Sequence, residues 1–409
     1  MLIVQKYGGS SVANLDRIKN VAQRIIKYHK EGHQLVVVVS AMAGETDRLI
    51  NLAKTITPDP PLRELDMLVS TGEQVTSSLL SITLQSMGVP SIALLGYQIP
   101  IYTNELFTKA RIKEIKVDKI KEELHQGKVV VVAGFQGVTE KGDITTLGRG
   151  GSDTTAVALA AALKADLCEI YTDVEGVFTA DPRIVDKARK LSKISYEEML
   201  EMSGAGAKVL EMRSVELAMI YKVPLVVRSS FNESEGTIIT EEDEEMEKVL
   251  VSGVTYNRNE ARISIYGVPD RPGIAAQIFG PIGEKGIVVD MIVQTSRVDG
   301  KADLTFTVPK TDYKQTMEIV KGIASSLSAE RVEGDEKIAK VSIIGAGMRT
   351  HSGVATKMFE TLAKHGINIM MISTSEIKIS CIIDEKYTEL AVRALHEAFE
   401  LEGEVKEEK

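Results

Sequence analysis

The chain has 409 residues, 44% of them hydrophobic and 26% charged, which predicts a globular protein of two or three domains and excludes fibrous or disordered classes. Forty-nine basic residues against 58 acidic ones give a net charge of −9, which argues against general binding to nucleic acid or to an anionic membrane. The two cysteines, Cys168 and Cys381, are too few for a disulfide framework or a cysteine zinc site, and no metal site is expected in the protein itself. Because the sequence shows no membrane-length apolar run and no signal peptide, we expect a cytoplasmic protein.

The first 240 residues alternate short β-rich runs with helical patterns, which predicts repeated β-α-β units. Four consecutive valines at 36–39 and again at 129–132 indicate strands covered on both faces, and therefore a mainly parallel sheet. Helices on both faces would make this part an α/β protein of the αβα sandwich type. The expected strands are Leu2–Val4, Leu35–Ser40, Ser91–Leu95, Val129–Gly134, Glu169–Tyr171 and Leu225–Val227.

Apolar residues spaced three and four apart predict helices with one apolar stripe each. One stripe consists of Val12, Leu15, Ile18, Ala22 and Ile25. A second, less regular stripe consists of Val75, Leu79, Ile82 and Met87. We expect both stripes to face the sheet.

The composition changes at Glu241–Glu247, a run that is nearly all acidic and whose self-repulsion makes it a poor core segment. An internal repeat follows, because Gly273–Phe279 is similar to Gly353–Phe359, and Gly286–Ile292 to Gly366–Ile372, at the same offset of 80 residues. Each copy predicts the order βαββα. The expected parts are 1–240, an acidic junction at 241–260, and repeat copies at 261–335 and 336–409, with a C-terminal strand able to complete the first copy.

The first strand is followed by Lys6-Tyr7-Gly8-Gly9-Ser10-Ser11, which leads into a helix. Two glycines allow a sharp turn that aims main-chain amides at an anion, and the helix N-terminus adds positive potential. Lys6 would add an ammonium group, although an ordinary strand-to-helix turn with an exposed lysine explains the motif equally well. The absence of a Walker A motif and of a GxGxxG turn disfavours P-loop NTPases and dinucleotide dehydrogenases.

A second glycine-rich loop, Thr145–Thr155, precedes an alanine-rich helix. Small residues around Arg149 leave room for a ligand, and the guanidinium fork suits a carboxylate. Asp153 could be only a helix N-cap. Two weaker motifs are Ser203–Lys208 and Ser70–Glu73, the second of which a capping box explains almost as well. Together the four loops supply cations, acids and helix N-termini, a mixture that suits phosphoryl transfer.

These motifs, in this order, carry a resemblance to the amino-acid kinase family, and within it to the monofunctional aspartate kinases. The motifs are KYGGSS, SAMAGET at Ser40–Thr46, STGE at Ser70–Glu73, LGRGGSDTTA at Leu147–Ala156, TDVEGVFTADPR at Thr172–Arg183 and GAK at Gly206–Lys208. The repeat resembles tandem ACT domains, which are ferredoxin-like amino-acid sensors. The resemblance extends over essentially the whole chain.

The resemblance implies transfer of phosphate from ATP, carried with Mg²⁺, to the side chain of L-aspartate, the first step of lysine, threonine and methionine synthesis. The nucleophile is a carboxylate that is already ionised at neutral pH, so no general base is required. By resemblance the catalytic residues are Lys6, Asp153 and Lys208. The implied ATP-binding residues are Lys6, Tyr7, Gly8, Gly9, Thr172, Asp173, Phe178, Thr179, Ala180, Asp181, Pro182, Arg183 and Lys208. The implied aspartate-binding residues are Ser40, Thr46, Glu73, Arg149, Gly150, Gly151 and Ser152, with Glu73 receiving the ammonium group.

The ACT resemblance implies feedback by lysine, threonine or both. The implied effector residues are Asp270, Arg271, Pro272, Gly273, Ala275, Val288, Asp290 and Gln294 in the first copy, and Asn368, Ile369 and Ser375 in the second. The second copy has Arg349–Ser352 in place of Asp270–Pro272, which leaves the number of effector sites open. We expect a homo-oligomer formed through the ACT domains, or an α2β2 assembly with a shorter chain that starts near Met246. Nucleic acid and membrane are not expected partners.

Three alternatives stay open at this point. A related kinase acting on glutamate or acetylglutamate would share the fold and the glycine loops. A sensor that binds nucleotide without transferring phosphate would share the ACT repeat, although Lys6, Glu73, Arg149 and Lys208 argue against it. A dehydrogenase is the most distant alternative.

Overall fold

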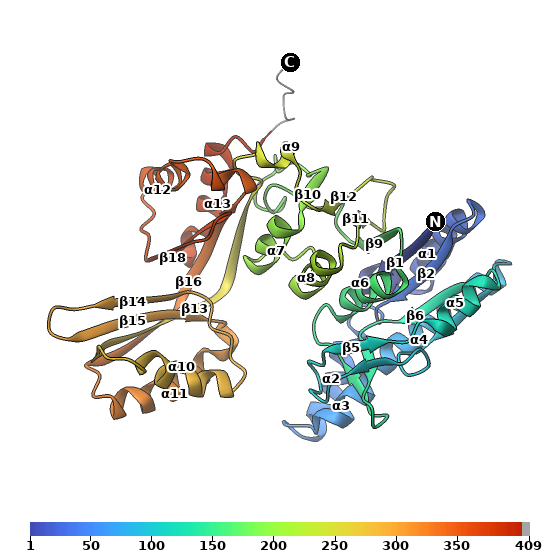
Figure 1. Ribbon diagram of the computed structural model, residues 1–409, viewed down its shortest axis with the longest axis horizontal. Helices are drawn as coiled ribbons and strands as arrows, with labels where there is room; N and C mark the ends of the chain where they lie inside the picture. The colour runs from blue at the N-terminus through green and yellow to red at the C-terminus, as the bar shows by residue number, and fades with distance from the viewer. Residues whose placement is uncertain (403–409) are drawn as a thin grey trace, which may run out of the picture. The chain divides into compact units, whose positions relative to one another are not determined.

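The computed structural model describes residues 1–402, which form two compact units (Figure 1). The first unit contains Met1–Val177, Lys190–Gly204 and Lys208–Met246. The second contains Phe178–Arg189, Ala205–Ala207 and the chain from Glu247 onward. No helix among residues 1–402 is both long enough and apolar enough to cross a membrane.

The first unit is built on an eight-stranded sheet in the order β10-β12-β11-β9-β1-β2-β6-β3, in which every neighbouring pair is parallel except β11 and β12. Its strands are β1 (Leu2–Tyr7), β2 (Gln34–Val39), β3 (Ser91–Leu94), β6 (Val129–Ala133), β9 (Leu167–Thr172), β10 (Lys193–Ser195), β11 (Leu225–Ser229) and β12 (Thr237–Thr240). All six strands expected from the sequence are confirmed. The valine runs are fully buried in β2 and β6, as two-sided cover requires.

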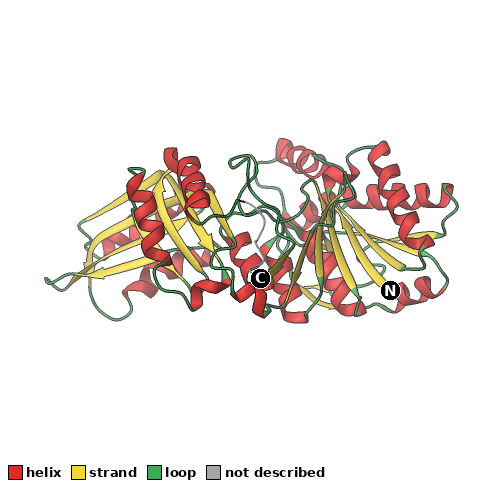
Figure 2. Ribbon diagram, turned by 90° about the horizontal axis from the view of Figure 1, so that it is seen from above, coloured by secondary structure: helices red, strands yellow, loops and turns green. Residues whose placement is uncertain are grey.

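Helices pack on both faces of this sheet, as Figure 2 shows for the first unit. The helices of this unit are α1 (Leu15–Lys30), α2 (Glu45–Ile56), α3 (Leu62–Val69), α4 (Thr71–Ser86), α5 (Asp118–His125), α6 (Gly151–Leu163), α7 (Tyr196–Gly204) and α8 (Met212–Tyr221). One core cluster joins α1 and α4 to β1, β2 and β6. The alanine-rich α6 contacts β1, β2 and β9. A small sheet in the order β5-β4-β7-β8 adds β4 (Ile101–Thr103), β5 (Ile112–Ile115), β7 (Gln136–Val138) and β8 (Ile144–Thr146). Helix α3 contacts β8 of this small sheet, and α8 contacts α6 and α7.

The predicted helical stripes are only partly right. Ile18, Ala22 and Ile25 are buried on α1, but Leu15 is exposed and Val12 belongs to a short 3₁₀ helix (Gly9–Val12) that precedes α1. On α4 the prediction is wrong, because three of the four stripe residues, Val75, Ile82 and Met87, are exposed. The buried face of α4 carries small and polar residues, namely Gly72, Glu73, Thr76, Ser77 and Ser81, together with Leu80 and Leu84.

The second unit contains a six-stranded sheet in the order β14-β15-β13-β16-β18-β17. Its elements are β13 (Gly253–Pro269), α10 (Ile274–Glu284), β14 (Ile292–Ser296), β15 (Lys301–Val308), α11 (Tyr313–Ser326), β16 (Arg331–Ile344), α12 (Val354–Lys364), β17 (Met371–Thr374), β18 (Lys378–Asp384) and α13 (Thr388–Ala398). The order βαββα therefore occurs twice, which confirms the repeat. Helices α10 and α11 pack on one half of the sheet, and α12 and α13 on the other.

Two long strands run through both halves of this sheet. The first eight residues of β13 pair with the part of β16 that also pairs with β18, whereas residues 261–269 pair with β15. Strand β13 begins at Gly253, inside the segment 241–260 that the sequence assigned to a junction, and a short helix α9 (Glu244–Glu247) lies before it. Any strand that follows residue 402 lies outside the described residues.

A segment from the middle of the sequence is folded into the second unit. The main-chain N–H of Val254 in β13 donates to the carbonyl of Thr179 (2.8 Å), and the Thr179 hydroxyl lies 2.9 Å from Nε2 of His396 in α13. The same hydroxyl accepts from the N–H of Arg189 at 2.9 Å. Thr179 and His396 are fully buried. The segment Phe178–Arg189, which the sequence placed in the first domain, is thus tied to β13 and α13.

Candidate active site

A cavity of about 380 Å³ lies in the first unit, where the chain leaves the carboxyl ends of β1 and β2 and where α6 begins. Open parallel sheets commonly bind ligands at this edge. The lining residues are Lys6, Gly9, Ser40, Ala41, Met42, Ala43, Gly44, Thr46, Asp47, Glu73, Phe135, Gly148, Arg149, Gly150, Gly151, Ser152 and Asp153. All seven residues predicted to bind aspartate are among them, together with Lys6 and Asp153.

The cation at the centre of this cavity is held by an ion pair. Nζ of Lys6, at the end of β1, lies 2.6 Å from the carboxylate of Asp153 in the first turn of α6, and both side chains are about nine-tenths buried. The N-cap position of α6 is Gly150, and no side chain caps that helix. Asp153 therefore orients Lys6 and is not the N-cap that the sequence left possible.

Arg149 stands in a loop whose shape depends on glycine. Gly148 and Gly150 both have positive φ, at +83° and +64°, which residues with a Cβ rarely adopt. A Cβ on Gly150 would lie 2.3 Å from the side chain of Glu211. The Arg149 side chain is exposed to the cavity and makes no hydrogen bond or ion pair with any residue between 1 and 402. Its guanidinium group is therefore free to take a carboxylate.

Glu73 adds a buried acidic side chain to the cavity that also holds the cations Lys6 and Arg149. Glu73 is 3% exposed, and its Oε1 atom accepts from the N–H of Ala41 (3.0 Å), while Oε2 has no partner among the described residues. Burial raises the pKa of Glu73 to about 7, against the lowering effect of that hydrogen bond. A ligand ammonium would satisfy the unpartnered oxygen and stabilise the charged form.

The two glycines after Lys6 serve close approach and not an unusual turn, contrary to the expectation. Neither has positive φ. A Cβ on Gly9 would lie 3.0 Å from the carbonyl oxygen of Ala41, and one on Gly8 would lie 3.4 Å from Nζ of Lys6. A side chain at Gly9 would therefore press on the main chain that follows β2, whereas one at Gly8 would only come into ordinary contact with the lysine.

Several residues predicted to bind ATP lie away from this cavity. The ring of Tyr7 is fully buried and stacks on Tyr171 with 4.7 Å between ring centroids, so only its main chain is available to a ligand. Thr172, Asp173 and Lys208 belong to the first unit but do not line the cavity, and Lys208 is exposed. The remaining predicted residues, Phe178, Thr179, Ala180, Asp181, Pro182 and Arg183, belong to the second unit, and Asp181 accepts hydrogen bonds from Arg183 and Tyr256 there.

The predicted site residues did not include several residues that line the cavity, among them Met42, Asp47 and Phe135. Phe135 follows β6 with a φ of +70°, and its ring would lie 2.8 Å from a Cβ on Gly151. The sequence does contain a signal for Phe135. This aromatic residue lies between Gly134 and Gly137, directly after a buried strand, and glycines at such a place indicate close approach of the backbone to another group.

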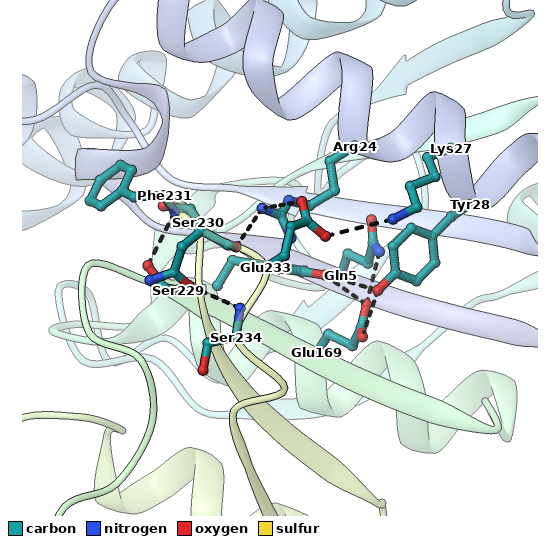
Figure 3. A network of polar contacts seen from close by, with 12 residues as sticks. Gln5, Arg24, Lys27, Tyr28, Glu169, Ser229, Ser230, Phe231, Glu233 and Ser234 are labelled. Atoms are coloured by element: carbon teal, nitrogen blue, oxygen red, sulfur yellow. Dashed lines mark hydrogen bonds and ion pairs between the residues drawn. The ribbon is translucent and has the colours of Figure 1, made fainter. Parts of the chain in front are cut away.

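A buried polar network fixes the strands that end near the cavity (Figure 3). The carboxylate of Glu169 in β9 is 1% exposed and accepts hydrogen bonds from Gln5 (2.9 Å), Tyr28 (3.1 Å) and Tyr171 (3.2 Å). Gln5 lies on β1 and Tyr28 on α1, so the network joins the sheet to the helix that covers it.

The loop after β11 is attached to the same helix. Glu233 pairs with Arg24 (3.4 Å) and Lys27 (3.6 Å) of α1, as Figure 3 shows. At the start of this loop the N–H of Ser230 donates to the carbonyl of Thr172 (2.9 Å). The carboxyl ends of β9 and β11 are thereby held together.

In the second unit, all the predicted effector residues of the first repeat copy are exposed. They lie in the turn between β13 and α10, at the start of α10, and in or just before the edge strand β14. In the second copy Asn368 and Ser375 are exposed and Ile369 is half-buried. Asp290 already has a partner, because it forms an ion pair with Lys340, a side chain that is 4% exposed and also pairs with Glu260 at 3.2 Å.

Comparison with known proteins gives matches over nearly the whole chain. Residues 1–229 match the amino acid kinase family, and residues 261–324 and 341–399 each match an ACT domain. An aspartate kinase of Stutzerimonas stutzeri is 58% identical over 403 residues, with 98% of each chain covered. An aspartokinase of Helicobacter pylori is 55% identical over 406 residues, covering 98% of this chain and all of the relative. The crystal structure of Escherichia coli aspartokinase III with aspartate and ADP has a TM-score of 0.83 at 28% identity, covering 97% of this chain and 99% of that one.

The chain therefore belongs to the amino acid kinase family, and its C-terminal part consists of ACT domains. Within that family it falls among the aspartate kinases.

Proposed function

We propose that the cavity holds L-aspartate and that the enzyme transfers the γ-phosphoryl group of ATP to its side-chain carboxylate, giving 4-phospho-L-aspartate and ADP. The observation that carries this proposal is the arrangement of Lys6, Arg149 and Glu73 around one cavity. Arg149 and Glu73, whose pKa is raised, match one carboxylate and the ammonium of aspartate, and Lys6 supplies a cation for the charge that develops when the other carboxylate is phosphorylated. The related Escherichia coli enzyme was crystallised with aspartate and ADP.

The residues divide the work as follows. Arg149 grips one carboxylate of aspartate through its guanidinium fork, and Glu73 takes the ammonium. The other carboxylate attacks the γ-phosphorus, the bond from that phosphorus to the bridging oxygen breaks, and its electrons remain on ADP. Lys6, oriented by Asp153, stabilises the negative charge that spreads over the transferring group. No general base is needed, because the attacking carboxylate is ionised at neutral pH.

Magnesium is proposed to arrive with the nucleotide. Between residues 1 and 402 no three His, Cys, Asp or Glu side chains are placed to hold a metal ion. Asp153 lies beside Lys6 among the carboxylates that line the cavity, and its oxygens would be available to the ion. Mg²⁺ is commonly bound in this way, by substrate phosphates, water and one or two carboxylates, and it would neutralise phosphate charge during transfer.

The direct test is capture of the product. Purified enzyme with ATP and magnesium should form an acyl phosphate from aspartate, which hydroxylamine traps as a hydroxamate. Glutamate and acetylglutamate, offered in parallel, should give little product because the cavity must match the shorter side chain. Release of ADP without trapped hydroxamate would overturn the proposal and favour nucleotide binding without transfer.

We further propose that the ACT domains bind lysine, threonine or both as feedback effectors. Asp270 is exposed and lies just before α10, so its carboxylate could bind the ammonium of a free amino acid. The main-chain N–H groups at the start of α10 could bind the carboxylate of the same molecule. A related Escherichia coli structure was solved with lysine and aspartate, at a TM-score of 0.77 and 28% identity. Calorimetry with each amino acid alone and with both together tests this, and the absence of heat in every titration would refute it.

Two points of organisation stay proposals. The assembly is a homo-oligomer through the ACT domains, or an α2β2 complex with a shorter chain starting near Met246, and native mass spectrometry distinguishes these forms. A cytoplasmic location is proposed from the sequence, and fractionation of cells that produce the protein tests it.

A further inference from the structure

A fully buried carboxylate outside the cavity holds the strand that leads into the Arg149 loop. Asp66 lies in α3 and is 0% exposed. Its Oδ2 atom accepts from the main-chain N–H groups of Thr108 and Thr146, both at 2.8 Å, and its Oδ1 atom accepts from the Thr146 hydroxyl at 2.6 Å. Thr146 is the last residue of β8, three positions before Arg149.

Burying the Asp66 carboxylate lowers the stability of the fold, so its presence calls for an explanation. Burial raises the pKa of Asp66, and the bonds from Thr146 and Thr108 offset part of that penalty. One of the donors, Thr108, has a φ of +67°, a left-handed conformation that threonine seldom adopts. The backbone is therefore strained at the point where it meets Asp66, and strain of this kind concentrates at functional sites.

A second side chain holds the same loop. Arg213 in α8 is half-buried and donates from Nη1 to the carbonyl of Leu147 (3.1 Å) and from Nη2 to the carbonyl of Ala110 (2.9 Å). Ala110 in turn donates its N–H to the carbonyl of Thr146 at 2.9 Å. The residues on either side of the bond between Thr146 and Leu147 are thus fixed by Asp66 and by Arg213.

The loop beyond these anchors is in close contact with them. A Cβ on Gly148 would lie 3.1 Å from the carbonyl oxygen of Thr108, so the strained threonine forms part of the wall behind Arg149. The N–H of Gly151 donates to the carbonyl of Gly148 at 3.0 Å, which closes the turn that carries Arg149. The Arg149 guanidinium has no hydrogen-bond or ion-pair partner within residues 1–402, so the position of this group depends on the loop that carries it.

We propose that Asp66 and Arg213 are positioning residues for aspartate recognition: together they set the backbone from which Arg149 reaches the substrate carboxylate. Neither residue lines the cavity. A bidentate grip on a carboxylate requires placement to within about 0.5 Å, which a glycine-rich loop does not supply unaided. This inference rests on the proposed role of Arg149.

The experiment compares Asp66→Leu, Asp66→Asn and Arg213→Met by steady-state kinetics in both substrates. Leucine removes both acceptor oxygens and with them all three hydrogen bonds. Methionine removes the two hydrogen bonds that Arg213 donates. We expect each to raise the aspartate KM about tenfold or more while the ATP KM stays within about twofold. Asparagine should restore most of the loss, because its oxygen can accept from the two N–H groups and its amide can donate to the Thr146 hydroxyl.

The control is Glu169→Met, which removes a carboxylate of similar burial from the network in Figure 3. Glu169 also accepts three hydrogen bonds, but all from side chains, and it has an ion-pair partner in Arg228 at 3.2 Å. Glu169→Met should lower thermal stability as Asp66→Leu does without a selective effect on the aspartate KM. Equal changes in both KM values for the Asp66, Arg213 and Glu169 variants would overturn the proposal in favour of a purely structural role. If Asp66→Leu does not fold, Arg213→Met alone carries the comparison with Glu169→Met, because it removes the second anchor of the same loop.

A double-mutant cycle separates this inference from the function on which it rests. If Asp66 acts through Arg149, then Asp66→Leu adds little to the aspartate KM of Arg149→Ala. A large effect of Arg149→Ala with no effect of Asp66→Leu would refute the positioning role alone. No effect of Arg149→Ala would refute the proposed role of Arg149 itself.

Discussion

The ammonium of Lys6 and the carboxylate of Asp153 meet at 2.6 Å although 147 positions separate them in the sequence. The lysine ends the strand β1, and the aspartate stands in the first turn of the helix α6 that packs on that strand. The fold thus presents one oriented cation at the carboxyl edge of the sheet.

Replacing Lys6 with alanine should lower kcat by about a thousandfold or more, because a transition-state cation in a sheltered site contributes several kcal/mol. The hydroxamate assay measures this loss, and circular dichroism checks that the variant is folded. Lys19→Ala, which removes a lysine with a 61% exposed side chain on α1, is the control and should keep full activity. A turnover close to that of the unmodified enzyme would remove Lys6 from the mechanism.

Replacing Arg149 with alanine should raise the aspartate KM about tenfold or more and leave ATP binding unchanged, since the lost contact is to a substrate carboxylate. Lysine at this position keeps the charge but not the fork, so Arg149→Lys should fall between the two. Initial rates with each substrate varied in turn give both KM values. An unchanged aspartate KM in the alanine variant would contradict the assignment.

Aspartate binding should release protons near pH 6.5. The pKa of Glu73 is about 7 when the cavity holds no ligand, so part of the population is protonated, and an incoming ammonium favours the ionised form. Calorimetry in buffers of different ionisation enthalpy measures the proton release, which should disappear in Glu73→Gln. The same heat in every buffer would show that Glu73 does not change its charge on binding.

The raised pKa of Glu73 also makes stability depend on pH. Because the folded state holds this proton more tightly than the unfolded chain, the free energy of unfolding should fall as the pH rises from about 4.5 to about 7 and then level off. The full cost above that range is about 3 kcal/mol. Glu73→Gln should therefore be more stable than the original protein at pH 8, as thermal unfolding can measure, while losing activity. Equal stability at pH 8 would argue against the raised pKa.

Replacing Thr179 with valine should loosen the segment Phe178–Arg189. Valine keeps the shape but leaves the N–H of Arg189 and the ring of His396 without their partner, at a cost of about 1–3 kcal/mol for each unpaired group. Hydrogen exchange at the Arg189 amide should accelerate, whereas Thr179→Ser should behave like the original protein. Unchanged exchange in the valine variant would mean that the hydroxyl does not hold this segment.

The sequence predicted what local patterns encode. The valine runs and the glycine-led repeat were found because period and spacing determine them. The loops around Lys6 and Arg149 were found from their glycines and cations, and the remaining predicted cavity residues from the resemblance to the amino-acid kinase family. The exposed stripe on α4 was missed because periodicity defines a helix face but not its partner, and the sheet accepts the small residues Gly72, Thr76 and Ser77 there. Asp66 gave no local signal at all, since the groups it binds lie 42 and 80 positions away.

The two long strands β13 and β16 decide how the regulatory half can be divided. A fragment that began at residue 336 would lose the strand residues 253–257, which pair with 340–344, so that β16 would become an unpaired edge strand. A polypeptide starting at Met246 would retain β13 entire, yet it would lack Thr179, the acceptor for the Val254 amide. Such a subunit could form its own sheet, but the Val254 N–H would need an acceptor from outside it, which Thr179 of a full-length chain could provide.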